Sequence, residues 1–593
     1  MTTETRRGGS WLIDTTEPSD VFTPEKLTDE HRLIAQTADE FVTNEVLPSL
    51  DQLEQKDWEL ARRLVRRAGA LGLLGVDVPE VYGGVGLDKT SSLVVSDHIA
   101  RAASFGATYG AQVNLAILPI YLFGTADQKQ KYLPKLASGE LIGAYALSES
   151  GSGSDALGAK ARAVRQADGT FVLNGEKMWI TNGGFADVFI VFAKVDGEHF
   201  TAFIVERAFP GVSSGKEERK MGLHGSSTTP LILQDAKVPA ANLLGETGKG
   251  HKVAFNVLNF GRFKLGAMCT GGAKAAIKEA ATYAAERRQF GQPIASFGAI
   301  KYKLGEMVAR TFAVESLLYR TAGLIDSRVE GSPAAQSTDG SAVLAALEEF
   351  AVEASIAKVS GSETLDYVLD ENIQIHGGNG FVRDYPAERH YRDSRVNRIF
   401  EGTNEINRLL IPGMLIRRAV KGELPLIAAA RQLQDEILGG PAALETGGDA
   451  PLEQELRTTA AFKKVALMIL GTAMQTYGEH LTDEQEVLTS IADIIMAGYA
   501  SESAVLRALD ANARKLAASS LQIDVARVFV NDAAGQIEIA ARDALAAMTA
   551  GDMLRTTLAA LRRLLKVTPI NTVVLRRTIA EETTAKGRYP FGA

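Results

Sequence analysis

The hydrophobic pattern changes its period twice along the chain, and this limits the possible folds more than any other feature. Over residues 28–133 apolar side chains recur at helical spacing. Between residues 141 and 244 they alternate along short segments, such as 189–192, with Gly and Asp turns between them, which predicts an antiparallel sheet or barrel. Helical spacing returns near residue 249 and continues to about residue 420. The chain is therefore predicted to be mostly α-helical with a central β domain.

At 593 residues the chain is too long for a single hydrophobic core, so several structural units are expected. An acidic segment rich in Gly and Pro at residues 422–451 is typical of a solvated linker. The residues after it are rich in Ala and Leu and again have helical spacing. The predicted units are an N-terminal helical domain (residues 26–140), a middle β domain (141–244), a helical bundle (248–420), a linker (421–455) and an extra helical domain (456–593).

Charge and composition are those of a soluble protein. The net charge of −8 gives no general attraction to nucleic acid or to anionic membranes. The single cysteine, Cys269, cannot form an intramolecular disulfide, which favours a reducing compartment. No segment has the length of a transmembrane helix, and no apolar signal core follows Arg6 and Arg7. We therefore expect a cytoplasmic location.

One basic stretch near the C-terminus leaves room for a weak contact with a membrane surface. Its charged residues lie beside leucines in the last predicted helices. A solvated helix face or a contact between subunits explains the same pattern more simply. The residues are Arg562, Arg563, Lys566, Arg576 and Arg577.

Glu401 is the first candidate for a catalytic residue. It is a lone carboxylate between an apolar pair and a glycine turn, just after a basic segment. A carboxylate in such a place can be desolvated, which raises its pKa and suits it to take a proton from carbon. On these residues alone, the simpler interpretation is a carboxylate that faces water at the end of a loop.

A Gly- and Ser-rich segment, residues 146–155, is the second candidate. Gly151, Gly153 and Ala156 match the Gly-x-Gly-x-x-Ala dinucleotide pattern, but that fingerprint must open a helix and here the chain continues into strands. We interpret the segment as a loop whose backbone N–H groups and hydroxyls, Ser148 and Ser154, face a ring system or an anion. The alternative is a connection that binds no ligand.

Three further side chains could contact a flat, charged cofactor. Trp179 stands two residues before Thr181, so a ring face and a hydroxyl could serve one ligand, although a tryptophan in a strand is more often part of the core. Arg287 at a predicted helix end could bind a pyrophosphate, with Phe290 offering a ring. The alternative is a helix end stabilised by its own arginines.

Residues 374–381 contain three glycines in four positions, which lets a ligand approach the backbone closely. His376 lies in this segment and could be a catalyst. A polar histidine at a helix end, without a partner, is the simpler interpretation.

The joint order of these segments resembles the acyl-CoA dehydrogenase family over residues 28–420. Both signature segments of that family are present, at residues 146–158 and 374–393. The resemblance implies a helical domain, a central β domain and a second helical bundle. The C-terminal extension is similar to that of the very-long-chain subgroup, which carries an additional helical domain.

The resemblance also implies a mechanism. Glu401 matches the base that takes the α-proton of an acyl-CoA while the β-hydrogen leaves as hydride to FAD, giving a trans-2-enoyl-CoA in fatty-acid β-oxidation. Some members carry the base on an earlier helix, but that position is Gly261 here, and Arg262 after it would hold the base loop or the CoA end. Reduced FAD would pass its electrons to an electron-transfer flavoprotein. No metal is expected.

The family pattern assigns the remaining contacts. Because two of the FAD contacts, Arg287 and Phe290, match positions that reach the cofactor of the neighbouring subunit, a homodimer is expected. Glu405 stands where several relatives have glutamine. The small residues Gly110 and Ala111 match the end of the acyl tail and favour long chains. The FAD contacts are Leu147, Ser148, Gly153, Ser154, Trp179, Ile180, Thr181, Arg287, Phe290, Gln374, Gly377, Gly378, Thr403 and Glu405; the substrate contacts are Ser154, Arg262, Gly402, Gly110 and Ala111.

Two alternatives remain at the level of sequence. An acyl-CoA oxidase would reduce FAD in the same way but give the electrons to oxygen. A non-catalytic assembly or interaction protein could keep the same fold, although it would have no physical need for Glu401, Trp179, Thr181 and Arg287 together.

Overall fold

The computed structural model describes residues 6–438 and 450–591. Its first unit is helical, as the hydrophobic spacing predicts. Thr28 accepts from the backbone N–H of His31 and so caps the first long helix, and Asp57 caps the third in the same way. The helices are α1 (Asp29–Phe41), α2 (Leu50–Glu54), α3 (Trp58–Ala70), α4 (Lys89–Ile99), α5 (Ala103–Gly110), the π-helical segment η7 (Ala111–Ile117), α6 (Leu118–Phe123) and α7 (Ala126–Ala137).

The middle unit is a mixed eight-stranded sheet, not the antiparallel sheet or barrel predicted from the sequence. Most neighbouring strands are antiparallel, but β1 and β2 both pair with β4 in parallel. Alternating hydrophobicity reports which face of a strand is buried and carries no information about strand direction. The strands are β1 (Gly143–Ala146), β2 (Arg162–Arg165), β3 (Phe171–Thr181), β4 (Val188–Val195), β5 (His199–Glu206), β6 (Val212–Ser214), β7 (Thr228–Val238) and β8 (Leu243–Leu244).

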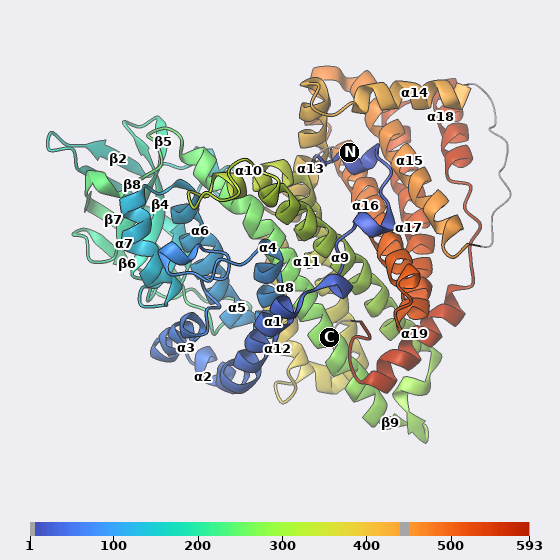
Figure 1. Cartoon of the computed structure of the whole chain (residues 1–593), viewed down its shortest axis with the longest axis horizontal. Helices are drawn as coiled ribbons and strands as arrows, with labels where there is room; N and C mark the ends of the chain where they lie inside the picture. Colours follow the sequence, from blue (N-terminus) through green and yellow to red (C-terminus); the bar gives the residue numbers. More distant parts are fainter. Residues whose placement is uncertain (1–5, 439–449, 592–593) are drawn as a thin grey trace.

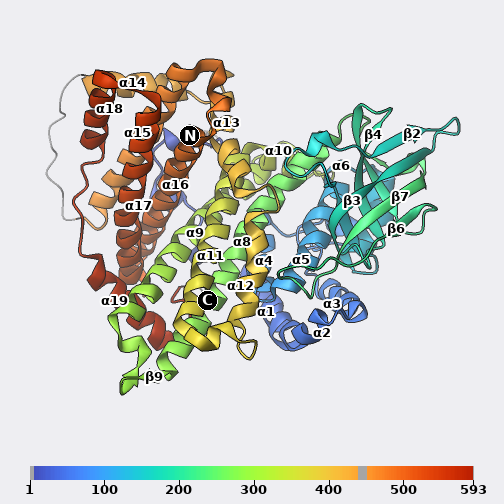
Figure 2. The ribbon, with the colours of Figure 1, turned by 180° about the vertical axis from the view of Figure 1, so that it is seen from behind.

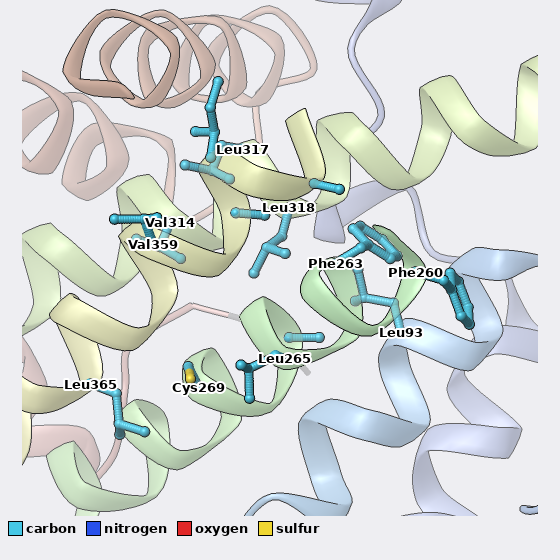
Figure 3. Packing of buried hydrophobic residues seen from close by; sticks show 14 of the residues in the cluster. Leu93, Phe260, Phe263, Leu265, Cys269, Val314, Leu317, Leu318, Val359 and Leu365 are labelled. Atoms are coloured by element: carbon cyan, nitrogen blue, oxygen red, sulfur yellow. The ribbon is translucent and has the colours of Figure 1, made fainter. Parts of the chain in front are cut away.

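A bundle of long helices forms the centre of the molecule (Figure 1). Glycines allow two of them to pack closely: a Cβ at Gly266 would lie 2.8 Å from the carbonyl oxygen of Ala357. Figure 3 shows buried apolar side chains packed between the helices of this bundle, with Phe263 and Leu318 among them. The elements are α8 (Gly250–Glu286), the hairpin β9 (Arg288–Gln289) and β10 (Gln292–Pro293), α9 (Gly298–Glu330), α10 (Ser341–Glu349), α11 (Ala351–His376), α12 (Ala387–Ser394) and α13 (Asn404–Val420).

The prediction of a linker at residues 421–455 is wrong in part. This segment contains helix α14 (Leu426–Leu438) and the start of α15. The apolar residues of α14 pack on α15, which a solvated linker would not do. Residues 439–449 of that prediction lie outside the described residues. The last helices are α15 (Glu453–Tyr477), α16 (Gln485–Ala513), α17 (Ser519–Met548), α18 (Gly551–Leu564) and α19 (Thr572–Lys586).

These C-terminal helices pack on the bundle at the side opposite the sheet, as Figures 1 and 2 both show. The contact is held by buried charges: Arg507 of α16 pairs with Glu315 of α9 at 2.7 Å and with Glu25 of the N-terminal segment at 2.7 Å. Arg320 of α9 pairs with Glu502 at 2.8 Å. The C-terminal helices therefore share a core with the bundle and the N-terminal segment.

One residue of the predicted basic stretch, Arg576, is buried in this core. Arg576 is 4% exposed and pairs with Glu306 of α9 at 2.7 Å, so it cannot face a membrane surface. Within residues 6–438 and 450–591, no helix combines the length and the hydropathy needed to cross a bilayer.

Candidate active site

A cavity of about 120 Å³ lies between α5, η7, α8, α11 and the segment that leads to Glu401; we call it the Glu401 cavity. One wall is a single face of α8 from Gly261 to Ala275, a length of about 21 Å at the rise of an α-helix. The opposite wall, on α5 and η7, consists mainly of small residues, which keeps the space open. These are Ala103, Gly106, Ala107, Gly110 and Ala111.

Glu401 stands in a loop with unusual backbone geometry. Its φ is +58° and that of Gly402 is +78°, and a left-handed conformation is unfavourable for a residue with a side chain. Three side chains hold the loop. Asn407 donates to the carbonyl oxygen of Gly402 at 2.9 Å, and Lys358 donates to the same oxygen at 2.8 Å. Arg262 donates through Nε to the carbonyl oxygen of Glu401 at 3.2 Å.

The surroundings of Glu401 hold its pKa near neutrality. Its Oε2 atom is buried and accepts no hydrogen bond from any residue that the structure describes. Desolvation raises the pKa of Glu401 to about 7, although the charges of Arg262 and Lys358 act in the opposite direction. Burial likewise lowers the pKa of Lys358 to about 8. A carboxylate in this state can accept a proton and can also hold it at ordinary pH.

Thr181 is the predicted cofactor residue that lines the Glu401 cavity. It ends strand β3, where a bulge between Lys177 and Ile180 interrupts the pairing with β7. The bulge places Trp179 at φ +57° with 56% of its surface exposed, whereas Ile180 beside it is buried. Trp179 is therefore not a core residue, and more than half of its surface is exposed near the end of β3.

The Gly- and Ser-rich loop lies against the same strand. Met178 donates its backbone N–H to the carbonyl oxygen of Ser148 at 2.9 Å, while Leu147 is buried and Gly153 and Ser154 are exposed. A Cβ at Gly153 would meet nothing within 4 Å. The loop therefore presents open backbone on its outer side.

A buried ion pair that the sequence did not reveal anchors this loop. Glu149 accepts from Nζ of Lys177 at 2.6 Å and from the backbone N–H of Ala161 at 3.0 Å. Lys177 is fully buried. Glu149 lies in the predicted loop at residues 146–155 and Lys177 stands two residues before Trp179, but nothing in their spacing marks them as partners.

Five other predicted cofactor residues lie at the far end of the bundle, away from Glu401. Arg287 follows α8, and Phe290 is 92% exposed in the hairpin β9–β10. Gln374, Gly377 and Gly378 are exposed at the end of α11. The two helix ends meet, because the hydroxyl of Tyr283 donates to the carbonyl oxygen of residue 376 at 3.2 Å. A Cβ at Gly377 or Gly378 would meet nothing within 4 Å.

The interpretation of His376 as a histidine without a partner was wrong. Its ring stacks on Tyr283 with the centroids 4.1 Å apart, and its Nδ1 lies 2.8 Å from the carbonyl oxygen of Asn372. His376 is buried and serves to join α8 to α11.

Two predicted residues follow Glu401 directly. Thr403 accepts from the backbone N–H of Ile406 at 3.2 Å and caps α13, and Glu405 is exposed in the first turn of that helix. Of the three side chains that hold the loop, Arg262 was predicted from the sequence, whereas Lys358 and Asn407 were missed. Asn407 lies six residues after Glu401, but Lys358 is distant in sequence and gives no signal there.

Fold and site together define a class of enzyme in which a buried carboxyl stands at one end of a cavity between helices. Family models match four segments: the acyl-CoA dehydrogenase N-terminal domain at residues 28–140, the middle domain at 144–236, the C-terminal domain at 248–415, and a further acyl-CoA dehydrogenase C-terminal domain at 461–563.

Relatives match over most of the chain. A probable acyl-CoA dehydrogenase from Bacillus subtilis is 51% identical over 97% of each chain. The crystal structure of an acyl-CoA dehydrogenase complexed with FAD from Bacillus anthracis superimposes with a TM-score of 0.97 and 52% identity, over 98% of this chain and 100% of that one. A short-chain specific acyl-CoA dehydrogenase from Megasphaera elsdenii is 39% identical over 66% of this chain and 99% of its own. The chain belongs to the acyl-CoA dehydrogenase family.

Proposed function

We propose that this protein is an FAD-dependent acyl-CoA dehydrogenase that forms trans-2-enoyl-CoA, with Glu401 as the base. The observation that carries the proposal is the state of the Glu401 carboxyl. Its Oε2 atom accepts no hydrogen bond from the described residues, its pKa is raised to about 7 by desolvation, and it lies at one end of the Glu401 cavity. An acyl thioester entering the cavity would bring its α-carbon to this carboxylate.

The residues around the cavity fit FAD. Trp179 offers an exposed ring beside Thr181, and the loop at Gly153 offers open backbone next to it. A flavin ring held there would face the same space as Glu401. FAD supplies the acceptor for the β-hydrogen, which leaves as hydride.

The predicted cofactor residues at the far end of the bundle indicate that a second subunit takes part in the active site. Arg287 follows Gly261 by 26 residues of almost continuous helix, which places it about 39 Å along α8 from the Glu401 carboxylate. Arg287 and Phe290, with Gln374, Gly377 and Gly378, would therefore bind the cofactor across a dimer interface. The 92% exposure of Phe290 is consistent with a hairpin that inserts into a partner. We infer a homodimer in which each active site takes residues from both subunits.

Several groups of the chain would act on the bound thioester. The α-proton is only weakly acidic, so charge that develops on the thioester oxygen needs a hydrogen-bond donor. The backbone N–H of Glu401 donates to none of the described residues and is available for this role. Arg262 and Lys358 keep enough of Glu401 ionised to accept the proton, and they fix the loop that carries it.

The cavity favours long acyl chains. The α8 wall, about 21 Å long, matches the length of an extended alkyl chain of roughly 16 carbons, and the enclosed 120 Å³ would have to widen to take up such a chain. Gly110 and Ala111 line it without blocking it. The short-chain specific relative shares only the first two thirds of the sequence. We infer that the substrate is a long-chain acyl-CoA, that the step belongs to fatty-acid β-oxidation, and that an electron-transfer flavoprotein reoxidises the flavin.

The proposal is tested by adding hexadecanoyl-CoA to the FAD-loaded protein without oxygen. Loss of the flavin absorbance near 450 nm, with one enoyl-CoA formed per flavin, is the expected result. Retention of full absorbance with every chain length from four to eighteen carbons would contradict it. Rapid peroxide formation when air is admitted would assign the protein to the oxidases instead.

A further inference from the structure

Asn114 is a buried amide that faces the Glu401 cavity without a hydrogen-bond partner. It is 6% exposed, it lines the cavity, and its Oδ1 accepts from none of the described residues. A buried amide without a hydrogen-bond partner destabilises the protein, because it has lost its contacts with water and gained none in return. Since none of the described residues pairs with this amide, its partner must come from whatever enters the cavity.

The local structure of η7 and the hydrogen bonds of Gln112 hold Asn114 at the wall of the Glu401 cavity. It lies in η7, a π-helical segment, and such segments recur at functional sites. Gln112 fixes this segment: it donates to the carbonyl oxygen of Leu136 at 2.7 Å and accepts from the backbone N–H of Gly143 at 2.6 Å. Gln112 therefore anchors η7 to α7 and β1, while Ala111, Asn114 and Leu115 line the cavity.

The packing of α5 and η7 against α8 gives the level of Asn114 in the cavity. Gly106 meets Met268, since a Cβ there would lie 2.8 Å from the Met268 Cε, and further along the chain Phe123 and Val253 both lie within 4.0 Å of a Cβ at Gly245. The two segments therefore run in opposite directions. Asn114 is about 12 Å beyond Gly106, and Gly261 is about 10 Å before Met268. Asn114 thus lies at the level of Gly261, at the same end of the cavity as the Glu401 carboxylate.

A second amide side chain, that of Asn397, lines the Glu401 cavity from the segment that precedes Glu401. Asn397 lines the cavity four residues before Glu401, is half-buried, and makes no side-chain hydrogen bond within the described part of the chain. Two amides together offer both donors and acceptors, which suits a group that can donate and accept. A hydroxyl does both, whereas a second anion would be repelled by the Glu401 carboxylate.

We propose that Asn114 and Asn397 form a polar subsite for acyl-CoA groups that carry a hydroxyl a few carbons beyond the reacting pair, at C4 to C6. This inference rests on the proposed function and refines its substrate class. An unsubstituted alkyl chain would displace water from both amides without forming hydrogen bonds to them. It would therefore bind less tightly than a hydroxylated chain.

The test uses ligands that cannot react. The dissociation constants of decyl-CoA, a thioether, and of its 4-, 5- and 6-hydroxy derivatives are measured by calorimetry on the FAD-loaded protein. We expect at least one hydroxylated ligand to bind about 10-fold tighter than decyl-CoA. In Asn114→Leu this ratio is expected to fall to about 1, and in Asn114→Ser to an intermediate value. The matched control, Leu115→Val, changes the same wall without an amide and should leave the ratio unchanged.

Two results would overturn the inference: no hydroxylated ligand preferred by the wild-type protein, or the same preference in Asn114→Leu. An ordered water held by Asn114 would give the second result. If Asn114→Leu fails to fold, Asn397→Leu and Asn114→Ser answer the same question. The proposed function is judged separately, by whether the wild-type protein oxidises decanoyl-CoA.

Discussion

Gly261 leaves the space that the Glu401 carboxylate occupies: a Cβ at position 261 would lie 2.8 Å from Oε2 of Glu401 and 3.0 Å from Oε1. The two residues are 140 positions apart, yet the size of one sets the position of the other. The α8 position where some family members carry the base is thus filled by the carboxylate of Glu401, reaching in from the loop before α13.

Gly261→Ala should therefore displace the carboxylate without disturbing the fold. The added methyl group meets only the end of a flexible side chain, so the melting temperature should stay close to that of the wild type. A shift of the base by a few tenths of an ångström to 1 Å is expected to slow flavin reduction about 10- to 100-fold. The measurement is stopped-flow reduction by hexadecanoyl-CoA.

Gly413→Ala is the matched control, because a Cβ at Gly413 would meet nothing within 4 Å. Equal reduction rates for the two alanine variants would show that the contact between Gly261 and Glu401 has no role in catalysis.

The pH dependence follows from the state of Glu401. Because its pKa is raised to about 7 by desolvation, the rate of flavin reduction should rise with pH and reach half its maximum near pH 7. The raised pKa also means that the neutral carboxyl favours the fold. That stability is fully present below about pH 4.3, the ordinary pKa of glutamate, and is lost as the pH rises through about 7.

Glu401→Gln should abolish this loss. Relative to wild type, the variant should gain on the order of 1 to 3 kcal/mol of unfolding free energy between pH 5 and pH 8. Denaturant unfolding at the two pH values measures this difference, and an equal difference at both values would contradict the raised pKa.

Lys358→Met tests the support of the base loop. It removes the donor to the carbonyl oxygen of Gly402 and a positive charge that lowers the pKa of Glu401. The midpoint of the pH–rate profile should move upward by about one unit, and the maximum rate should fall about 10-fold. A lower maximum with an unmoved midpoint would mean that Lys358 acts on position alone.

Ala111→Phe tests the acyl wall. The larger side chain would fill the cavity beyond the reacting carbons, so kcat/KM for hexadecanoyl-CoA should fall more than 10-fold, while butanoyl-CoA should be affected much less. Flavin content and melting temperature serve as controls for overpacking. A uniform loss across chain lengths would place the acyl tail elsewhere.

The order of the units and the segments around the site could be predicted from sequence, since each depends on local spacing. The period of hydrophobic residues identified the helical units and the strands, and the Glu401 segment stood out by its composition. The parallel pairing of β1 and β2 with β4 could not be predicted, because alternation does not encode direction.

Other features depend on contacts between distant parts of the chain. The ion pairs of Arg507 with Glu25 and Glu315 join three segments that are separate in sequence, so the C-terminal helices appeared to be an appendage. Lys358 gives no local sign of its role, because only the packing of α11 buries it beside the loop at Gly402. Asn114 was missed for the same reason: its orientation depends on the π-helical turn of η7.

The central claim is that Glu401 takes the α-proton, and the most direct test is the rate of flavin reduction in Glu401→Gln. The amide keeps the size of the side chain but cannot accept the proton, so reduction by hexadecanoyl-CoA should slow by about 10² to 10⁴-fold. FAD content and the affinity for the non-reactive decyl-CoA should stay close to those of the wild type. Reduction of Glu401→Gln at the wild-type rate, with FAD bound, would show that another group is the base.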